Sequence, residues 1–98
     1  LVNGTTISAA EIVALAIKNA PKATVIGEPT AGALARITFQ PLLGGASTRI
    51  TGAGVYLNDG RCTYPDGIPL DFVVRQTPED IKADKDTQLE FAKTLLAK

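Results

Sequence analysis

The sequence predicts an α/β fold with a mixed sheet, a helix rich in apolar residues, a hairpin and a C-terminal helix. Three observations support this fold class. A helical pattern at residues 8–20 lies between two short apolar segments, two alternating segments follow around a glycine-rich turn, and charged helix formers fill the chain from residue 77 onward. With 98 residues, 45% of them hydrophobic and 20% charged, the chain has a globular composition. Its size is that of one small domain or part of a larger one.

The overall composition excludes several classes of function. The formal net charge is zero, so the chain carries no electrostatic signature of a nucleic-acid partner or an anionic membrane. Cys62 is the single cysteine and histidine is absent, which leaves no internal disulfide and no cysteine–histidine metal cluster. No pair of carboxylates stands out for metal binding, and no apolar run approaches the roughly 20 residues of a membrane span. We therefore expect no cofactor, no metal and no nucleic acid.

The first part of the chain predicts a βαβ unit. Residues 1–3 (LVN) have the character of a strand end, and a helix is expected from Ser8 to about Ala20, with Pro21 as its stop signal. The β-branched run ATVIG at 23–27 is typical of a buried parallel strand. Such a unit should be right-handed.

The helix expected after Ser8 has few polar positions. Its apolar residues, with alanines between them, are Ile12, Val13, Leu15 and Ile17. A helix of this composition is predicted to be buried on most sides. Because the chain also starts inside a strand, we expect residues 1–98 to be a segment of a longer protein. On its own, such a segment should expose an apolar patch of roughly several hundred Å² and self-associate.

The rest of the chain alternates between turns and short elements. Residues 28–33 are a loop by their proline and glycine content. In order, the remaining predicted elements are strands at 34–42 and 48–57 joined by a turn, a second turn at 58–60, a strand at 72–75, a helical turn beginning at 77–80 and a helix within 87–98. The last helix should present one stripe of side chains: Leu89, Ala92, Leu95 and Leu96.

Three features resemble functional motifs but have simpler explanations. GEPTAG at 27–32 lacks the Gly-Lys-Ser/Thr of a phosphate-binding loop, and GAG at 52–54 is typical of a bulge inside a strand. Cys62 follows a turn and has no histidine to activate it, so packing or chance explains it better than catalysis. We assign no function to any of the three.

Ser8 has two interpretations. Ser8-Ala9-Ala10-Glu11 fits the capping box, in which the serine hydroxyl accepts from the Glu11 N–H and the glutamate side chain accepts from the serine N–H. The alternative is a nucleophile, because a serine at a helix N-terminus lies among unpaired N–H groups. The N–H of Ala9 could then stabilise the oxyanion formed when the hydroxyl attacks a peptide carbonyl. The local pattern fits both.

Four segments, in order, resemble one family. TTISAAEIV at 5–13 and IGEPTAG at 26–32 are similar to the helix start and the Gly-Glu-x-Thr-x-Gly loop of the C-terminal processing (tail-specific) peptidases and their tricorn-like relatives. PDGIPLDFVV at 65–74 and KDTQL at 85–89 resemble two later motifs of that family. The resemblance covers essentially the whole chain. It implies a crotonase-like α/β core and aligns Ser8 with the family's nucleophile.

The general base is missing from the sequence. In the family branch that uses a serine–lysine dyad, the lysine follows the glycine of this loop, where the chain has Ala33. Lys18 and Lys22 cannot easily replace it, since ten residues of helix place Lys18 roughly 15 Å from Ser8. Histidine is absent. The base must therefore come from another part of the parent protein, or the site is inactive.

In the tricorn-like branch, the resemblance implies a histidine from an earlier segment and a late orienting carboxylate. Asp66 is the nearest candidate for that carboxylate, and the alternative is an ordinary turn aspartate in Pro-Asp-Gly. Glu11 is expected to cap the helix first and to tune the site second. The residues expected to form the oxyanion site or to shape it are Ala9, Glu11, Gly27, Glu28, Thr30 and Gly32.

Taken with the resemblance, the sequence predicts a serine endopeptidase that acts through Ser8 and an acyl-enzyme, near the C-termini of proteins. Residues 1–98 would be the C-terminal part of its catalytic domain. The alternatives are a non-catalytic peptide-binding relative that has lost the base and a purely structural fragment. The expected partners are a peptide or protein substrate and the N-terminal part of the same parent chain. The resemblance suggests a location in the cell envelope or periplasm.

Overall fold

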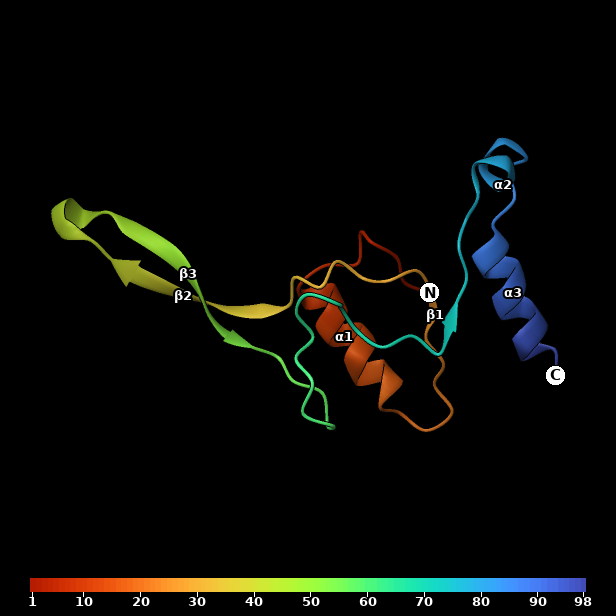
Figure 1. Ribbon diagram of the computed structural model, residues 1–98, viewed down its shortest axis with the longest axis horizontal. Coiled ribbons are helices and arrows are strands. Elements are labelled where there is room, and N and C mark those ends of the chain that lie inside the picture. The colour runs from red at the N-terminus through yellow and green to blue at the C-terminus, as the bar shows by residue number, and fades with distance from the viewer.

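The computed structural model describes all residues from 1 to 98 as three parts arranged along one axis. In chain order the elements are α1 (Ala9–Lys18), β1 (Ile26–Gly27), β2 (Ala35–Pro41), a 3-10 turn (Leu43–Gly45), β3 (Ser47–Gly54), β4 (Phe72–Val73), α2 (Pro78–Lys82) and α3 (Thr87–Leu96). A central body contains α1, the β2–β3 hairpin projects from one side of it, and α2 and α3 lie on the other side (Figure 1). The molecule measures 58 × 34 × 16 Å.

The central body is built on short parallel strands. Val2 bridges Gly27 in parallel, and β1 pairs in parallel with β4, with Ile26 opposite Phe72. Since α1 connects the first two of these segments, the predicted βαβ arrangement is present, although β1 is shorter than the expected strand at 23–27. Gly27 has a φ of 141°, and a Cβ added there would lie 1.9 Å from the Val2 carbonyl oxygen. Only glycine allows the two segments to approach this closely.

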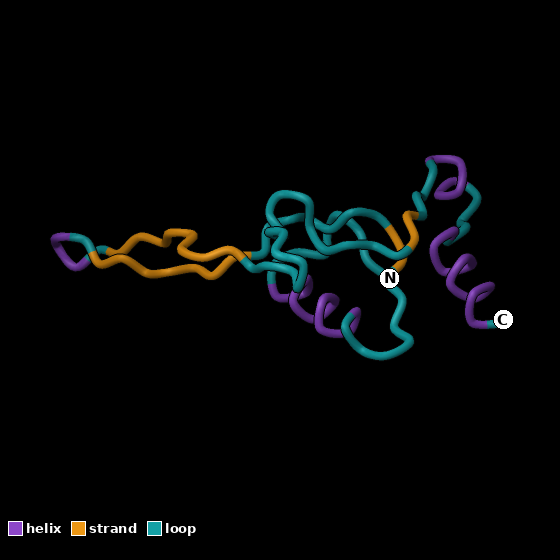
Figure 2. Tube along the Cα trace, turned by 60° about the horizontal axis from the view of Figure 1, so that its bottom comes forward, coloured by secondary structure: helices purple, strands orange, loops and turns teal.

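The β2–β3 hairpin confirms the prediction from alternating residues. The strands are antiparallel, with Phe39 opposite Arg49 and an irregularity in register between Arg36 and Ile37. Nearly all of its residues are exposed, and the ribbon extends away from the central body in both views (Figures 1 and 2). The hairpin therefore contributes almost nothing to the buried core.

A small apolar core lies between α1 and the parallel strands. Val2, Val25 and Ile68 are buried there, and the side chains packed against them are Ala14, Leu15 and Leu70. The expectation that α1 is buried on most sides is wrong for this chain, because Ile12, Val13 and Ile17 are 52–58% exposed. The parallel strands contact the helix along one face, and no other element of the chain covers the remaining faces. An exposed apolar surface along α1 follows from this geometry.

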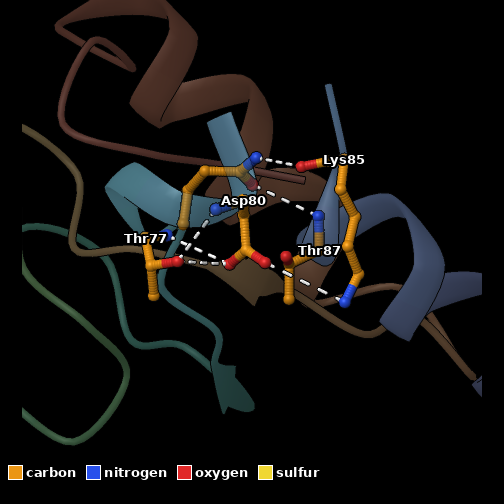
Figure 3. Close-up of polar contacts among 5 residues, drawn as sticks. Thr77, Asp80, Lys85 and Thr87 are labelled. Carbon is orange, nitrogen blue, oxygen red and sulfur yellow. Dashed lines mark hydrogen bonds and ion pairs between the residues drawn. The ribbon is translucent and has the colours of Figure 1, made fainter. Parts of the chain in front are cut away.

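Polar contacts fix the corner between α2 and α3. The predicted helical turn is present as α2, and Thr77 caps it: its hydroxyl accepts from the Asp80 N–H, and the Asp80 carboxylate accepts from the Thr77 N–H and hydroxyl (Figure 3). The Gln76 side chain donates to the Lys85 carbonyl and accepts from the Thr87 N–H. The Gln76 bonds connect the segment before α2 to Lys85 and to the first residue of α3.

The face through which α3 packs overlaps the predicted stripe only in part. Phe91 lies 5.3 Å from Phe72 between ring centroids, so the aromatic residue of β4 sets the contact face. Within the predicted stripe, two residues are half-buried, Ala92 and Leu95, and two are exposed, Leu89 and Leu96. No helix of the chain has the length and apolar character required to span a membrane.

Candidate active site

Ser8 occupies an unusual backbone conformation at the start of α1. Its φ is 56° and its ψ is −116°, a region that costs an ordinary L-residue about 1–3 kcal/mol and persists where the surroundings enforce it. The residue is exposed, and its hydroxyl forms no cap hydrogen bond. The N–H of Ala9, the first residue of α1, is also without a partner in the chain. A free hydroxyl therefore lies next to a free backbone donor at the positive end of the helix.

Only the glutamate half of the predicted capping box closes with hydrogen-bond geometry. Ser8 and Glu11 are placed as in a capping box, and the Ser8 N–H donates to Glu11 Oε2 over 2.9 Å. The Glu11 N–H, however, donates to the Ser8 carbonyl oxygen at 2.9 Å. A capping serine normally has an extended backbone, and the positive φ of Ser8 redirects its side chain. In this arrangement the Glu11 carboxylate stabilises the turn, and the Ser8 hydroxyl forms no hydrogen bond within the chain.

Glu11 is the centre of the site. It is completely buried, and it is the buried residue of α1. Its Oε1 accepts from the Thr30 hydroxyl at 2.7 Å and from the Gly32 N–H at 2.9 Å, and its Oε2 accepts from the Ser8 N–H at 2.9 Å and the Ala33 N–H at 3.2 Å. This carboxylate holds the Ser8 turn against the loop 28–33.

The same hydrogen bonds determine the charge of Glu11. Burial raises the pKa of a carboxyl group, but the hydrogen bonds from Thr30, Gly32, Ser8 and Ala33 outweigh burial and hold the pKa of Glu11 below its ordinary value. The position of Glu11 in the first turn of α1, near the positive end of the helix dipole, acts in the same direction. Glu11 is therefore an anion without a cationic partner, stabilised by dipoles.

The loop that receives Glu11 is closed by a second turn. The Thr30 hydroxyl accepts from the Ile68 N–H at 3.0 Å, which connects it to the segment before β4. Gly32 has a φ of 67°, and a Cβ there would lie 1.8 Å from the Pro65 carbonyl oxygen. A Cβ on Gly67, whose φ is 81°, would lie 2.2 Å from the Thr30 hydroxyl oxygen. Both glycines are required by close backbone approach as well as by their φ angles.

Position 33 lies beside Ser8. Because the N–H groups of Ser8 and Ala33 donate to the same carboxylate oxygen, their nitrogen atoms lie at most about 6 Å apart, the combined length of the two bonds. Lys18, by contrast, is at the far end of α1 and forms an ion pair of 2.6 Å with Asp71. Lys18 is engaged away from the serine, as the helical spacing predicts.

The structure does not bring all of the predicted residues into this network. Asp66 is exposed, its side chain forms no hydrogen bond within the chain, and it borders a cavity of about 310 Å³ that Ser8 does not line. Glu28 accepts from the Gln76 N–H at 3.0 Å and so connects the loop to the segment after β4. Gly27 serves the strand contact with Val2.

Sequence reasoning missed the turn at 63–68 as a support of the site. Thr63 is completely buried, and the Gly67 N–H donates to its carbonyl oxygen at 2.7 Å. This places the Ile68 N–H against Thr30. The available signal is the Pro-Asp-Gly sequence at 65–67, which on its own indicates an ordinary turn. The Ala31 N–H also donates to the Thr6 carbonyl oxygen at 3.0 Å, a second link between the loop and the Ser8 turn.

The chain is similar to known peptidases over most of its length. The family model of peptidase family S41 matches residues 1–74. Eleven chains of solved structures match, among them a crystal structure of a protein from Parabacteroides merdae that is provisionally assigned as a peptidase. That protein is 31% identical, with a TM-score of 0.76 and a match that covers 93% of this chain. The chain spans 29% of the length of that protein. A comparison with curated proteins finds no match.

Proposed function

Because the chain belongs to peptidase family S41, we propose that it carries the nucleophile of a serine endopeptidase and that Ser8 is this nucleophile. The observation that carries the proposal is the strained Ser8 turn, with φ at 56° and ψ at −116°, an exposed hydroxyl and a free Ala9 N–H. Strain of this kind concentrates at functional sites, and nucleophilic serines at sharp turns before helices are a recurring solution. A residue that served only as a helix cap would not need a strained backbone conformation.

The proposed mechanism uses the groups around Ser8 in sequence. The Ser8 oxygen attacks the carbonyl carbon of the scissile bond while its proton passes to a general base, and the Ala9 N–H stabilises the oxyanion. The C–N bond then breaks, and the amine leaves with a proton from the same base. Water, deprotonated in turn, attacks the acyl-enzyme and releases the carboxylic acid and free Ser8. Glu11 holds the turn in place throughout through its bond to the Ser8 N–H.

The general base is proposed to come from outside residues 1–98. Lys18 is paired with Asp71, and histidine is absent from the chain. Asp66 remains a proposed orienting carboxylate for an incoming base, because its exposed side chain has no partner in the chain. We further propose a crotonase-like fold for the complete catalytic domain, cleavage near protein C-termini and a location in the cell envelope, all on the basis of the family resemblance.

The test compares the intact protein with Ser8→Ala and Ser8→Thr variants on an unstructured peptide. Ser8→Ala should abolish cleavage while preserving the fold, because loss of a nucleophile lowers the rate by many orders of magnitude. Ser8→Thr should also fold, but its extra methyl group disturbs an attack distance of about 3–3.5 Å and should leave little activity. Thermal unfolding of all three proteins provides the control. A Ser8→Ala variant that cleaves like wild type would end the assignment.

One observation favours a second candidate, a peptide-binding protein that has lost its base. Ala33 lies beside Ser8, at the position where the resemblance places a dyad lysine. In that case the intact protein should bind peptides saturably and cleave none. Ala33→Lys would then place an amine near the hydroxyl and should produce cleavage that Ser8→Ala removes. If the wild type is active and Ala33→Lys adds nothing, the base is supplied from elsewhere.

A further inference from the structure

The β2–β3 hairpin has the open backbone of a docking surface. Its strands pair only with each other, so the outer edge of each strand keeps unpaired N–H and C=O groups. Nearly every residue of the two strands is exposed. A two-stranded ribbon without further cover is marginally stable in water, and an extended segment added to one edge would satisfy that edge.

The base of this hairpin lies next to Ser8. Ala33, two residues before β2, is within about 6 Å of Ser8 between backbone nitrogens, because both N–H groups bond to one Glu11 oxygen. Leu34 is 2% exposed and anchors the start of the strand in the central body. Figures 1 and 2 both show the first turn of α1 at the base of the hairpin. The N-terminal end of β2 therefore lies close to Ser8.

The side chains of the hairpin have a selective chemistry. All ten carboxylates of the chain lie outside residues 29–58, whereas Arg36 and Arg49 lie within that range. Ile37 and Phe39 are 54% and 61% exposed. The Arg49 guanidinium lies over the Phe39 ring, 5.2 Å from its centroid, and so leans from β3 toward β2. The surface beside the β2 edge is apolar and cationic.

We propose that an extended segment of the substrate adds as a strand to the outer edge of β2, and that Arg36 and Arg49 select segments in which two carboxylates, one for each arginine, are separated by apolar residues. A strand rises about 3.3 Å per residue, so Arg36 lies about 10 Å beyond Ala33, and Phe39 with its stacked arginine about 20 Å beyond it. The preferred carboxylates should therefore lie about three and six residues from the scissile bond. This register rests on the proposed role of Ser8, whereas the binding itself does not.

The experiment uses the intact protein and unstructured peptides with one cleavage site. One pair of peptides carries either Asp or Lys at the positions three and six residues before the scissile bond. A second pair carries them at the positions three and six residues after it. The wild type should prefer the Asp peptide of one side by about tenfold in kcat/KM, mainly through KM. Arg36→Glu/Arg49→Glu should reverse the preference. Arg75→Glu/Lys98→Glu, which makes the same change in net charge outside the hairpin, should leave the preference unchanged.

Binding to the Ser8→Ala protein separates this proposal from the peptidase assignment. Fluorescence anisotropy with the same peptides should show the same preference and the same reversal. If binding reverses but no protein cleaves, the docking surface stands and the peptidase assignment fails. If cleavage depends on Ser8 but neither cleavage nor binding responds to the hairpin charges, the docking proposal is overturned. Arg36→Gln/Arg49→Gln removes the positive charges without reversing them and should abolish the preference for Asp peptides. This variant tests the proposal even if the glutamate variant does not fold.

Discussion

The Thr30 hydroxyl donates a 2.7 Å hydrogen bond to Oε1 of Glu11, 19 residues earlier in the chain, and both side chains are buried. The same hydroxyl oxygen accepts from the Ile68 N–H at 3.0 Å. One threonine therefore joins the helix that carries the candidate nucleophile to the loop beside it and to the turn before β4. Thr30 is connected to the Ser8 turn through Glu11, because the Ser8 N–H donates to the other oxygen of the same carboxylate.

Thr30→Val should lower the free energy of unfolding by about 1–3 kcal/mol. Valine keeps the shape of threonine but leaves the Ile68 N–H and one Glu11 oxygen with fewer partners in a buried place. Denaturant unfolding of the intact protein measures the loss. Thr30→Ser retains the hydroxyl and should be less destabilised. A valine variant as stable as the wild type would show that the hydroxyl is dispensable.

Glu11→Gln should make the stability of the fold less sensitive to acid. The pKa of Glu11 is held below its ordinary value of 4.5, so its ionised form stabilises the fold above about that pH. The contribution is lost as the pH falls from this value through the pKa of the folded state. Melting temperatures between about pH 7 and pH 3 should therefore fall less steeply for Glu11→Gln, which starts from a lower value. Glu79→Gln, at an exposed residue, is the control and should follow the wild type.

Gly32→Ala should destabilise the protein far more than Gly60→Ala. Both glycines have a positive φ, at 67° and 87°, and an alanine there costs about 1–2 kcal/mol from backbone strain alone. The Cβ at position 32 would also lie 1.8 Å from a carbonyl oxygen, whereas nothing lies within 4 Å at position 60. The difference in thermal stability between the two variants measures the cost of the clash at position 32, because both variants carry the backbone strain. Equal losses would mean that the loop moves aside freely.

Lys18→Met should cost less than about 1 kcal/mol, because the ion pair with Asp71 is partly exposed, with 20% and 36% of the two side chains accessible. Asp71→Ala should cost more, since Asp71 also accepts from the buried Val25 N–H at 2.7 Å. Cleavage by the intact protein should survive Lys18→Met. Loss of activity in this variant with an intact fold would identify Lys18 as the base and contradict our assignment.

Residues 1–98 in isolation should self-associate and should not cleave peptides. The radius of gyration is 17.2 Å, compared with about 13 Å for a compact domain of this length. A groove of about 510 Å³ opens along α1, and its apolar lining includes Leu1, Val13 and Ile17. Val13→Glu/Ile17→Glu should shift sedimentation toward the monomer. A strictly monomeric, cooperatively unfolding wild-type chain at high concentration would contradict the prediction.

The elements with a local pattern could be predicted from the sequence. The helix after Ser8, the hairpin and the helical turn that begins at Thr77 each follow from neighbouring residues, and all three are confirmed. Burial was harder to predict. The apolar composition of α1 indicated a covered helix, but cover depends on what lies opposite, and only one face has a neighbour in this chain. The contact of α3 likewise depended on Phe72, which the helical pattern does not contain.

The candidate site was predictable at Ser8 and much less so around it. Glu11 fits a capping box locally, and its burial arises from partners 19 to 22 residues away. No periodicity in the sequence encodes such contacts. The positive φ of Ser8 was also hidden, because serine is an ordinary cap residue and the strain becomes visible only in the folded backbone.

The Glu11 carboxylate is the shared hydrogen-bond acceptor of three backbone amides from two separate segments of the chain. The N–H groups of Ser8, Gly32 and Ala33 all end on its two oxygens, although they belong to a turn and a loop that have no regular secondary structure. These amide protons can exchange with solvent only when their hydrogen bonds to the carboxylate break. Their hydrogen exchange should therefore be slow for loop residues, and the three amides should have the same opening free energy. The turn and the loop would then behave as one cooperative unit, which opens and closes around a single side chain.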